Sequence, residues 1–140
     1  MSMKLLRRFH HIGLKVNHTF DIFRNIEFYE SLRGGASQYD DYEETKARVL
    51  SLRSYIEAHR GEMCLTHIDA VPDNFLLYPR NGQTHLQLID WEYAGMQDPH
   101  VDIAMFCLYS YYKRQQVDHL IDLYFEGSCK IGRASCRERV

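Results

Sequence analysis

The stretch "LTHIDAVPDNFLL", residues 65–77, gathers polar side chains between apolar neighbours. Three of them, His67, Asp69 and Asn74, form the pattern His-x-Asp-x4-Asn, with Pro72 inside the spacing. A second stretch, "LQLIDWEYAG", residues 86–95, ends an apolar run on the carboxylate of Asp90. Proline stiffens the first stretch because its ring fixes φ. The two stretches predict two rigid loops that carry oxygen-bearing side chains.

The chain between these loops has the pattern of a β-hairpin. Residues 74–78 and 85–89 are short apolar runs, and "PRNGQ" between them contains Asn81-Gly82, a strong signal for a two-residue turn. Asp90 then closes the second strand. We therefore expect Asp69, Asn74 and Asp90 to converge on one point.

Those three side chains have the chemistry that phosphoryl transfer needs. A carboxylate can accept the proton of an attacking hydroxyl, and carboxylate and amide oxygens are hard ligands that suit magnesium. The spacing is similar to the kinase catalytic loop, H-x-D-x4-N. Asp69 is the candidate base, and Asn74 and Asp90 are the candidate metal ligands. Because Asp and Asn both favour turns, a structural turn is the alternative for Asp69 and Asn74.

At this point the chain resembles the aminoglycoside phosphotransferase and choline kinase superfamily, whose fold is the two-lobed protein-kinase-like fold. "LTHIDAVPDNFLL" is similar to its catalytic loop, and "LIDWEYAGMQDPHVDIAMF", residues 88–106, is similar to its metal-binding segment and following helix. The D-x-E form of Asp90-Trp91-Glu92 is most like bacterial choline and ethanolamine kinases. The resemblance implies an α+β, mainly α fold: part of the C-terminal lobe, with helices and a small hairpin that carries the active-site loops.

The resemblance also implies roles for individual residues. Asp69 would be the base, with magnesium and ATP as cofactors, and Asn74 and Asp90 would hold the metal. His67 would brace the loop, although alone it is most simply a core histidine. Asp102 would brace the catalytic loop from the next helix, and the alternative for it is a first-turn helix charge. Glu92 would support the metal site.

The family's N-terminal lobe has no counterpart in the sequence. Nothing before His67 has the pattern of a five-stranded sheet, a glycine-rich nucleotide loop or its phosphate-contacting lysine. The chain is therefore expected to be the front of a C-terminal lobe that does not turn over alone. A catalytically silent, kinase-like interaction module is the alternative from another class. The absence of H-R-D, D-F-G and A-P-E argues against a protein kinase.

Aromatic side chains near the proposed site favour choline as the alcohol substrate. A quaternary ammonium is recognised by aromatic faces, each contact being worth about 0.5–2 kcal/mol. The candidates are Trp91, Tyr109 and Tyr112, of which the tyrosines fit a core position equally well. An aminoglycoside would need many carboxylates, and residues 101–112 contain only Asp102. Ethanolamine remains an open alternative.

Hydrophobic periodicity predicts helices over most of the remaining chain. They are expected over residues 4–11, 20–29, 40–59, 101–112 and 117–124. Thr19 or Asn17 is expected to cap the second helix, and Asp40 with Glu43 to form a capping box for the third. The inward face of the third helix is expected to carry Val49, Leu52 and Ile56. Gly127 is expected to end the last helix.

Composition excludes several other classes of protein. The 140 residues have a net charge of −2, which implies no broad basic surface for nucleic acid. No apolar run is long enough to cross a bilayer, and the start lacks the pattern of a secretory signal. The four cysteines are irregularly spaced, so reduced thiols in the cytoplasm are expected.

The last ten residues, "IGRASCRERV", differ from the chain before them. They have no helical or strand periodicity and resemble a translated sequencing adapter. We expect residues 1–130 to form the partial kinase-like lobe and residues 131–140 to be a non-native tail. A genuine flexible basic tail is the alternative.

Overall fold

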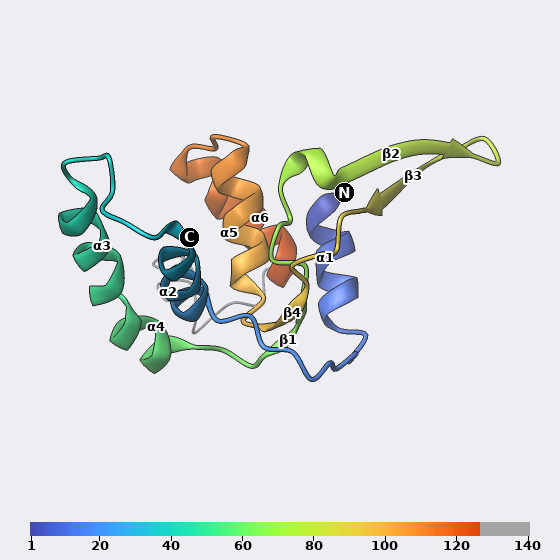
Figure 1. The fold of residues 1–140 in the computed structure, drawn as a ribbon. Coiled ribbons are helices and arrows are strands. Elements are labelled where there is room, and N and C mark those ends of the chain that lie inside the picture. Colours follow the sequence, from blue (N-terminus) through green and yellow to red (C-terminus); the bar gives the residue numbers. More distant parts are fainter. Residues whose placement is uncertain (127–140) are drawn as a thin grey trace. The chain divides into compact units, whose positions relative to one another are not determined.

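Residues 1–126 are described by the computed structural model, and they divide into two units. The main unit comprises Met1–Phe20 and the chain from Gly61 onward, and the inserted unit comprises Asp21–Arg60. The sequence-predicted functional residues all lie in the main unit. Figure 1 shows the elements of both units.

The core of the main unit lies among three helices, α1 (Ser2–His10), α5 (His100–Tyr109) and α6 (Arg114–Phe125). Helix α6 contacts both α1 and α5. On α1 the buried side chains recur at three- and four-residue spacing, as one face of a helix requires. The buried core cluster consists of Met3, Leu6, Ala70, Leu88, Ile103, Cys107, Ile121 and Tyr124.

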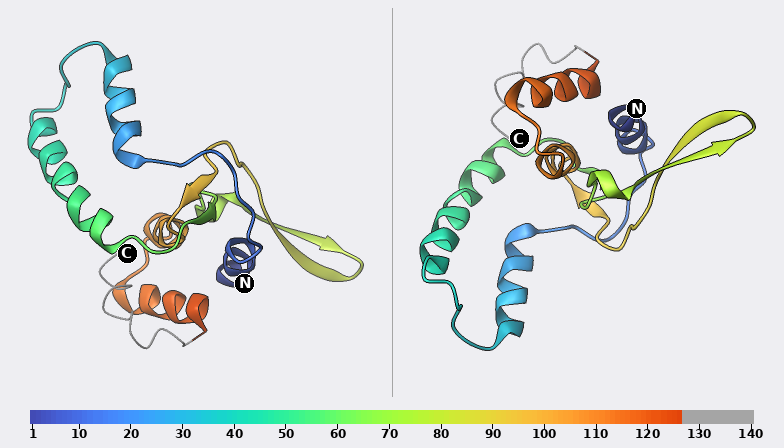
Figure 2. Two further views of the ribbon diagram at one scale, coloured as in Figure 1. Left: turned by 90° about the horizontal axis from the view of Figure 1, so that it is seen from below. Right: turned by 90° about the horizontal axis from the view of Figure 1, so that it is seen from above.

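The predicted hairpin is present as β2 (Phe75–Arg80) and β3 (Gln83–Leu88). The strands are antiparallel, with Phe75 opposite Leu88 and Arg80 opposite Gln83. Asn81 and Gly82 both have positive φ, 52° and 73°, as a type I′ turn requires. Figures 1 and 2 show the hairpin extending away from the helices of its unit. Its base therefore joins the two loops identified in the sequence.

A second, smaller sheet precedes the catalytic loop and was not predicted. Strand β1 (Cys64–Thr66) pairs antiparallel with β4 (Gly95–Gln97), and Thr19 adds a parallel bridge to Met96. Gly95 allows this approach, because a Cβ there would lie 3.2 Å from the backbone nitrogen of Phe20. Three-residue strands are too short to show a periodicity, and their partners are distant in sequence.

The inserted unit contains three helices, α2 (Ile22–Arg33), α3 (Tyr42–Ser51) and α4 (Arg53–His59). The N-cap of α2 is Asp21, whose carboxylate accepts hydrogen bonds from the next turn, so the prediction of Thr19 or Asn17 was wrong. The predicted capping box at Asp40 was also wrong. Helix α3 follows Asp41 and has no side-chain cap.

The single helix predicted over residues 40–59 is divided at Leu52. The amide of Leu52 bonds to the carbonyl of Val49, a tighter three-residue spacing that interrupts the α-helical ladder. The predicted inward face is exposed in the structure, with Val49 39%, Leu52 53% and Ile56 40% accessible. Polar contacts join α2 to α3 instead, because Glu30 accepts bonds from Tyr42 and Lys46 and these lower its pKa.

The buried Asp98 lies just before the start of α5 in the main unit. Its buried carboxylate accepts hydrogen bonds from the backbone nitrogens of Gly61 and His100 and from the His100 ring. Burial opposes the charged form, but these hydrogen bonds outweigh it and lower the pKa of Asp98 to about 2. The charged form of Asp98 therefore holds Gly61 at the start of α5.

Asp98 is expected to make stability depend on pH in acid. Its pKa is depressed on folding from the ordinary 3.8, so its stabilisation is complete above about pH 4 and is lost as pH falls toward 2. We expect the wild type to lose about 2 kcal/mol of unfolding free energy over that range through this group. Asp98→Asn should flatten that slope in urea titrations. An unchanged slope would contradict the assignment.

Within residues 1–126, none of the helices combines the length and apolar character needed to cross a bilayer. The predicted end of the last helix at Gly127 and the predicted non-native tail, residues 131–140, lie outside the described residues. The boundary at residue 130 between the kinase-like lobe and the tail stays a prediction.

Candidate functional site

The loop between β1 and β2 brings Asp69 and Asn74 together. A short 3-10 turn, η1 (Pro72–Asn74), folds the chain back, with Pro72 at its first position. The Asn74 side-chain nitrogen donates to the backbone oxygen of Asp69 at 2.8 Å and to its carboxylate at 3.1 Å. The amide is thereby oriented, and its oxygen points away from Asp69. That oxygen is available as a ligand for a hard cation.

Asp90 lies two residues beyond the end of β3, and its neighbour Ile89 is hydrogen-bonded to this loop. The Ile89 amide donates to the Asn74 carbonyl at 3.0 Å, which continues the hairpin pairing by one step. Asp90 has a φ of +67°, a conformation that Asp tolerates better than most residues, and its side chain is exposed. The chain thus turns sharply out of the strand at the carboxylate.

The oxygen donors at the base of the hairpin are two carboxylates and one amide. In the described part of the chain, no three His, Cys, Asp or Glu side chains are grouped closely enough to hold a metal ion. A divalent cation here would therefore rely on the Asn74 amide oxygen beside Asp69 or Asp90. Few protein oxygens, completed by water and phosphate oxygens, are the donor set that magnesium accepts and that zinc does not favour.

The His67 side chain links the catalytic loop to the segment that carries Asp90. Its ring is fully buried, and Nε2 donates to the Ile89 carbonyl at 2.8 Å, the residue before Asp90. Nε2 must therefore carry the ring proton, while Nδ1 has no hydrogen-bond partner among the described residues. The ring fixes the distance between the catalytic loop and the Asp90 segment.

Asp102, the buried acid of α5, holds the backbone of the same loop. Its carboxylate accepts from the His67 amide at 2.8 Å and from the Ile68 amide at 2.7 Å. Ile68 has a φ of +73°, which is strained for a β-branched residue. The two charge-assisted bonds keep this conformation, and it directly precedes Asp69.

His10 and Tyr124 complete the bracing of the loop, and sequence analysis missed both. His10 Nε2 lies 2.9 Å from the Asp102 carboxylate, and His10 Nδ1 lies 2.7 Å from the Tyr124 hydroxyl. All three side chains are buried. The signal in the sequence was that His10 follows Met3 and Leu6 on the apolar face of α1, where a histidine needs polar partners.

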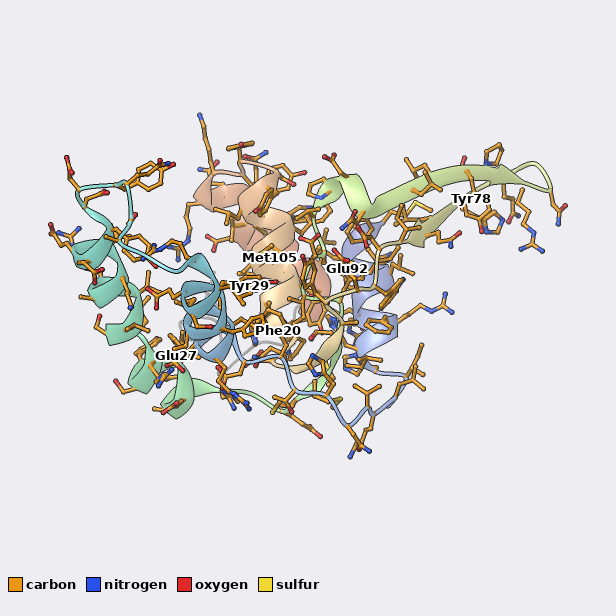
Figure 3. The ribbon with its side chains drawn as sticks, viewed as in Figure 1. Phe20, Glu27, Tyr29, Tyr78, Glu92 and Met105 are labelled. Atoms are coloured by element: carbon orange, nitrogen blue, oxygen red, sulfur yellow. The ribbon has the colours of Figure 1, made fainter. Side chains whose placement is uncertain are left out.

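Trp91 packs into the site and does not stand free beside it. Its indole nitrogen donates to the Leu88 carbonyl at 3.0 Å. Its ring meets those of His67 and Phe9 edge-on, with centroids 4.6 and 4.8 Å apart. Trp91 is still 41% exposed, so part of its side chain remains accessible. Glu92 is exposed near the base of the hairpin, whereas Tyr78 lies well out along it (Figure 3).

The two tyrosines predicted to contact substrate differ in position. Tyr112 lies 6.3 Å from Phe106, ring to ring, and Phe106 contacts Phe75, which follows Asn74. Tyr112 also lines an open pocket of about 350 Å³ with Gln115, Gln116, His119 and Leu120. Tyr109 is 56% exposed and stands at the end of α5, about 10 Å along the helix axis from Asp102.

The two cysteines in the described residues are poor nucleophiles. Burial raises the pKa of Cys64 to about 12 and that of Cys107 to about 11, and nearby carboxylates add to the effect at Cys64. Both thiols stay protonated near neutral pH, so thiolate chemistry is not available to them. The oxygen groups of the two loops therefore stay the candidates for the chemistry of the site.

The sequence matches a known family along nearly its whole length. The model of the phosphotransferase enzyme family matches residues 3–139. Protein LicA of Haemophilus influenzae is 28% identical over 121 residues, which cover 85% of this chain and 44% of that protein.

Solved structures give the same result for the fold. LicA in complex with AMP aligns with a TM-score of 0.80 and 33% identity, over 87% of this chain and 42% of that one. Choline kinase LicA from Streptococcus pneumoniae aligns with a TM-score of 0.79 and 33% identity, with the same coverage. A choline/ethanolamine kinase family protein from Mesorhizobium loti has a TM-score of 0.80 at 23% identity, over 99% and 46%. This confirms the predicted fold class, an α+β, mainly α part of a kinase-like fold. The chain spans less than half the length of each of these relatives.

Proposed function

Because this chain belongs to the phosphotransferase enzyme family, we propose that it is part of a small-molecule kinase that transfers a phosphoryl group from ATP to choline. The observation that supports this most strongly is the meeting of Asp69, Asn74 and the Asp90 segment at the base of one hairpin. The chain would supply the catalytic loop and the metal-binding segment. The relative solved with AMP supports the use of a nucleotide.

Asp69 acts as the general base. It accepts the proton of the attacking alcohol as the oxygen forms its bond to phosphorus, so it must be ionised and within hydrogen-bond reach of the hydroxyl. Asn74 orients it through the 3.1 Å contact to its carboxylate. A side chain held by a rigid turn loses little entropy when the substrate arrives.

Asn74 and Asp90 would hold magnesium. The bound ion would neutralise charge on the nucleotide phosphates. The amide of Asn74 is fixed by its donor side, which leaves its oxygen for the metal, and the carboxylate of Asp90 is exposed at the end of β3. Glu92, two residues further on, adds negative charge near the site.

His67 and Asp102 set the geometry of the loop without touching the reactants. His67 fixes the Asp90 segment through the Ile89 carbonyl, and Asp102 fixes the strained backbone before Asp69. Because a misplacement of about 1 Å can cost two orders of magnitude in rate, these buried contacts bear directly on catalysis.

Choline is the proposed alcohol because the site region offers aromatic side chains and α5 offers no free carboxylate. Trp91 exposes one face, Tyr112 lines a pocket, and Tyr109 is a third, more distant candidate. The one acid of α5, Asp102, is buried and already accepts backbone hydrogen bonds, so it cannot meet an ammonium group. A polycationic aminoglycoside would lack partners on this helix. The solved relative from Streptococcus pneumoniae is a choline kinase.

The substrate assignment is tested by a panel of acceptors. The protein that carries this chain is incubated with ATP, magnesium and either choline, ethanolamine or an aminoglycoside, and ADP release is measured. We expect kcat/KM for choline to exceed that for ethanolamine by about tenfold, because the better-hydrated primary ammonium gains less from an aromatic face. A preference for an aminoglycoside would contradict the proposal, and no turnover with any acceptor would favour a silent module.

A further inference from the structure

Four buried groups form a continuous hydrogen-bonded path from α6 to the catalytic loop. The Tyr124 hydroxyl contacts His10 Nδ1 at 2.7 Å, and His10 Nε2 contacts Asp102 at 2.9 Å. Asp102 accepts the Ile68 amide at 2.7 Å. Tyr124 is 2% exposed and His10 6%, so both need hydrogen-bond partners within the protein.

The donors and acceptors along this path can be assigned. The Asp102 carboxylate only accepts, so His10 Nε2 carries a proton and donates to it. Among the described residues, the Tyr124 hydroxyl is hydrogen-bonded to His10 Nδ1. Burial raises the pKa of Tyr124, so the hydroxyl keeps its proton and is able to donate it to Nδ1. The His10 ring is therefore held from both sides, by Asp102 at Nε2 and by Tyr124 at Nδ1.

We infer that Tyr124 is a positioning residue for the catalytic loop, acting through His10 and Asp102. The hydroxyl holds the His10 ring in the one orientation that points Nε2 at Asp102. Asp102 then has three N–H donors, from His10, His67 and Ile68. These three hydrogen bonds hold the Asp102 carboxylate against the strained backbone of Ile68. Without the hydroxyl, the ring is free to rotate, and the carboxylate loses its support from α1.

Hydrogen exchange tests this inference independently of any activity. Tyr124→Phe removes the hydroxyl and keeps the ring, and it should accelerate exchange of the His67 and Ile68 amides by about tenfold. Amides in the β2–β3 ladder should not change. Tyr42→Phe is the matched control, because it removes a hydroxyl bonded to Glu30 at 2.6 Å in the inserted unit. Equal acceleration of all amides, or no acceleration at His67 and Ile68, would overturn the inference.

A measurement on the wild-type chain decides the proton assignment even if Tyr124→Phe does not fold. The ¹⁵N shifts of the His10 ring should show a protonated Nε2 and a hydrogen-bonded Nδ1. An unprotonated Nε2, or an Nδ1 without a hydrogen bond, would overturn the inference.

A double-mutant cycle separates action through His10 from a general loss of packing, and this arm rests on the proposed function. Tyr124→Phe should lower kcat by about tenfold with the KM for the alcohol unchanged. In a His10→Ala background the same change should have no further effect on kcat, because the path is already broken. Additive effects would overturn the inference. Absence of turnover in the wild type would refute the proposed function, while exchange and ring shifts still decide the role of Tyr124.

Discussion

Asp69→Asn is expected to lower kcat by about a thousandfold in the protein that carries this chain, the loss typical of removing a positioned general base. The amide is the same size as the carboxylate but cannot accept the proton of the alcohol. Stability should change little, because the oxygen of the new side chain can still accept the 3.1 Å hydrogen bond from Asn74. The check is a steady-state assay together with the urea midpoint of unfolding.

Asp73→Asn is the matched control for this experiment. Asp73 lies in the same loop, within η1, and its side chain is exposed. The same change of charge there should leave kcat close to that of the wild type. If Asp69→Asn kept wild-type turnover, or if both variants lost activity equally, Asp69 would not be the base.

Asp102→Asn is expected to have the second-largest effect, on stability as well as on rate. The new amide group would place N–H donors against the donors of His67, Ile68 or His10 in a fully buried site. Leaving buried donors unpaired should cost about 3 kcal/mol of unfolding free energy. Because Ile68 is then no longer held in its left-handed backbone conformation, Asp69 moves, and kcat should fall by about a hundredfold.

The control for Asp102→Asn is Asp118→Asn on α6. Asp118 pairs with Arg114 four residues earlier at a partly exposed position, and such pairs contribute less than about 1 kcal/mol. Denaturant titration and kinetics on both variants separate the buried bracing role from a loss of helix charge. If Asp102→Asn behaved like Asp118→Asn, Asp102 would be only a first-turn helix charge.

The parts of the site that sequence predicted well are the local ones. Asn81-Gly82 determined the hairpin because the turn type depends on two adjacent residues, and the hairpin in turn places Asp90 beside Asn74. The spacing of Asp69 and Asn74 spans one turn of chain, so a single motif could carry it.

Interactions between residues far apart in sequence could not be predicted. His10 meets Asp102 and Tyr124 across sequence separations of 92 and 114 residues, and no local pattern marks such pairs. The β1–β4 sheet was not predicted for the same reason, because its two strands are far apart in sequence. The cap of α2 was misplaced for a different reason: Asn17, Thr19 and Asp21 are all good capping residues, and only the backbone geometry selects Asp21.

The sequence identified the aromatic residues near the site, but it did not show what their rings contact. Trp91 was expected to face a substrate, but much of its ring packs edge-on against His67 and Phe9. An indole at this position can both order the catalytic loop and leave one face free. Sequence composition cannot separate these uses, because both require a large apolar ring.

Paramagnetic relaxation by Mn²⁺, which takes the same oxygen ligands as magnesium, tests most directly whether one cation is shared by the two loops. Mn²⁺ is added with ATP to the protein that carries this chain, and broadening of the Asp69, Asn74 and Asp90 resonances is followed by NMR. Simultaneous broadening of all three at the lowest Mn²⁺ concentration, abolished in Asp90→Asn, is the expected result. Broadening of Asp90 without Asn74, or of neither, would contradict the account.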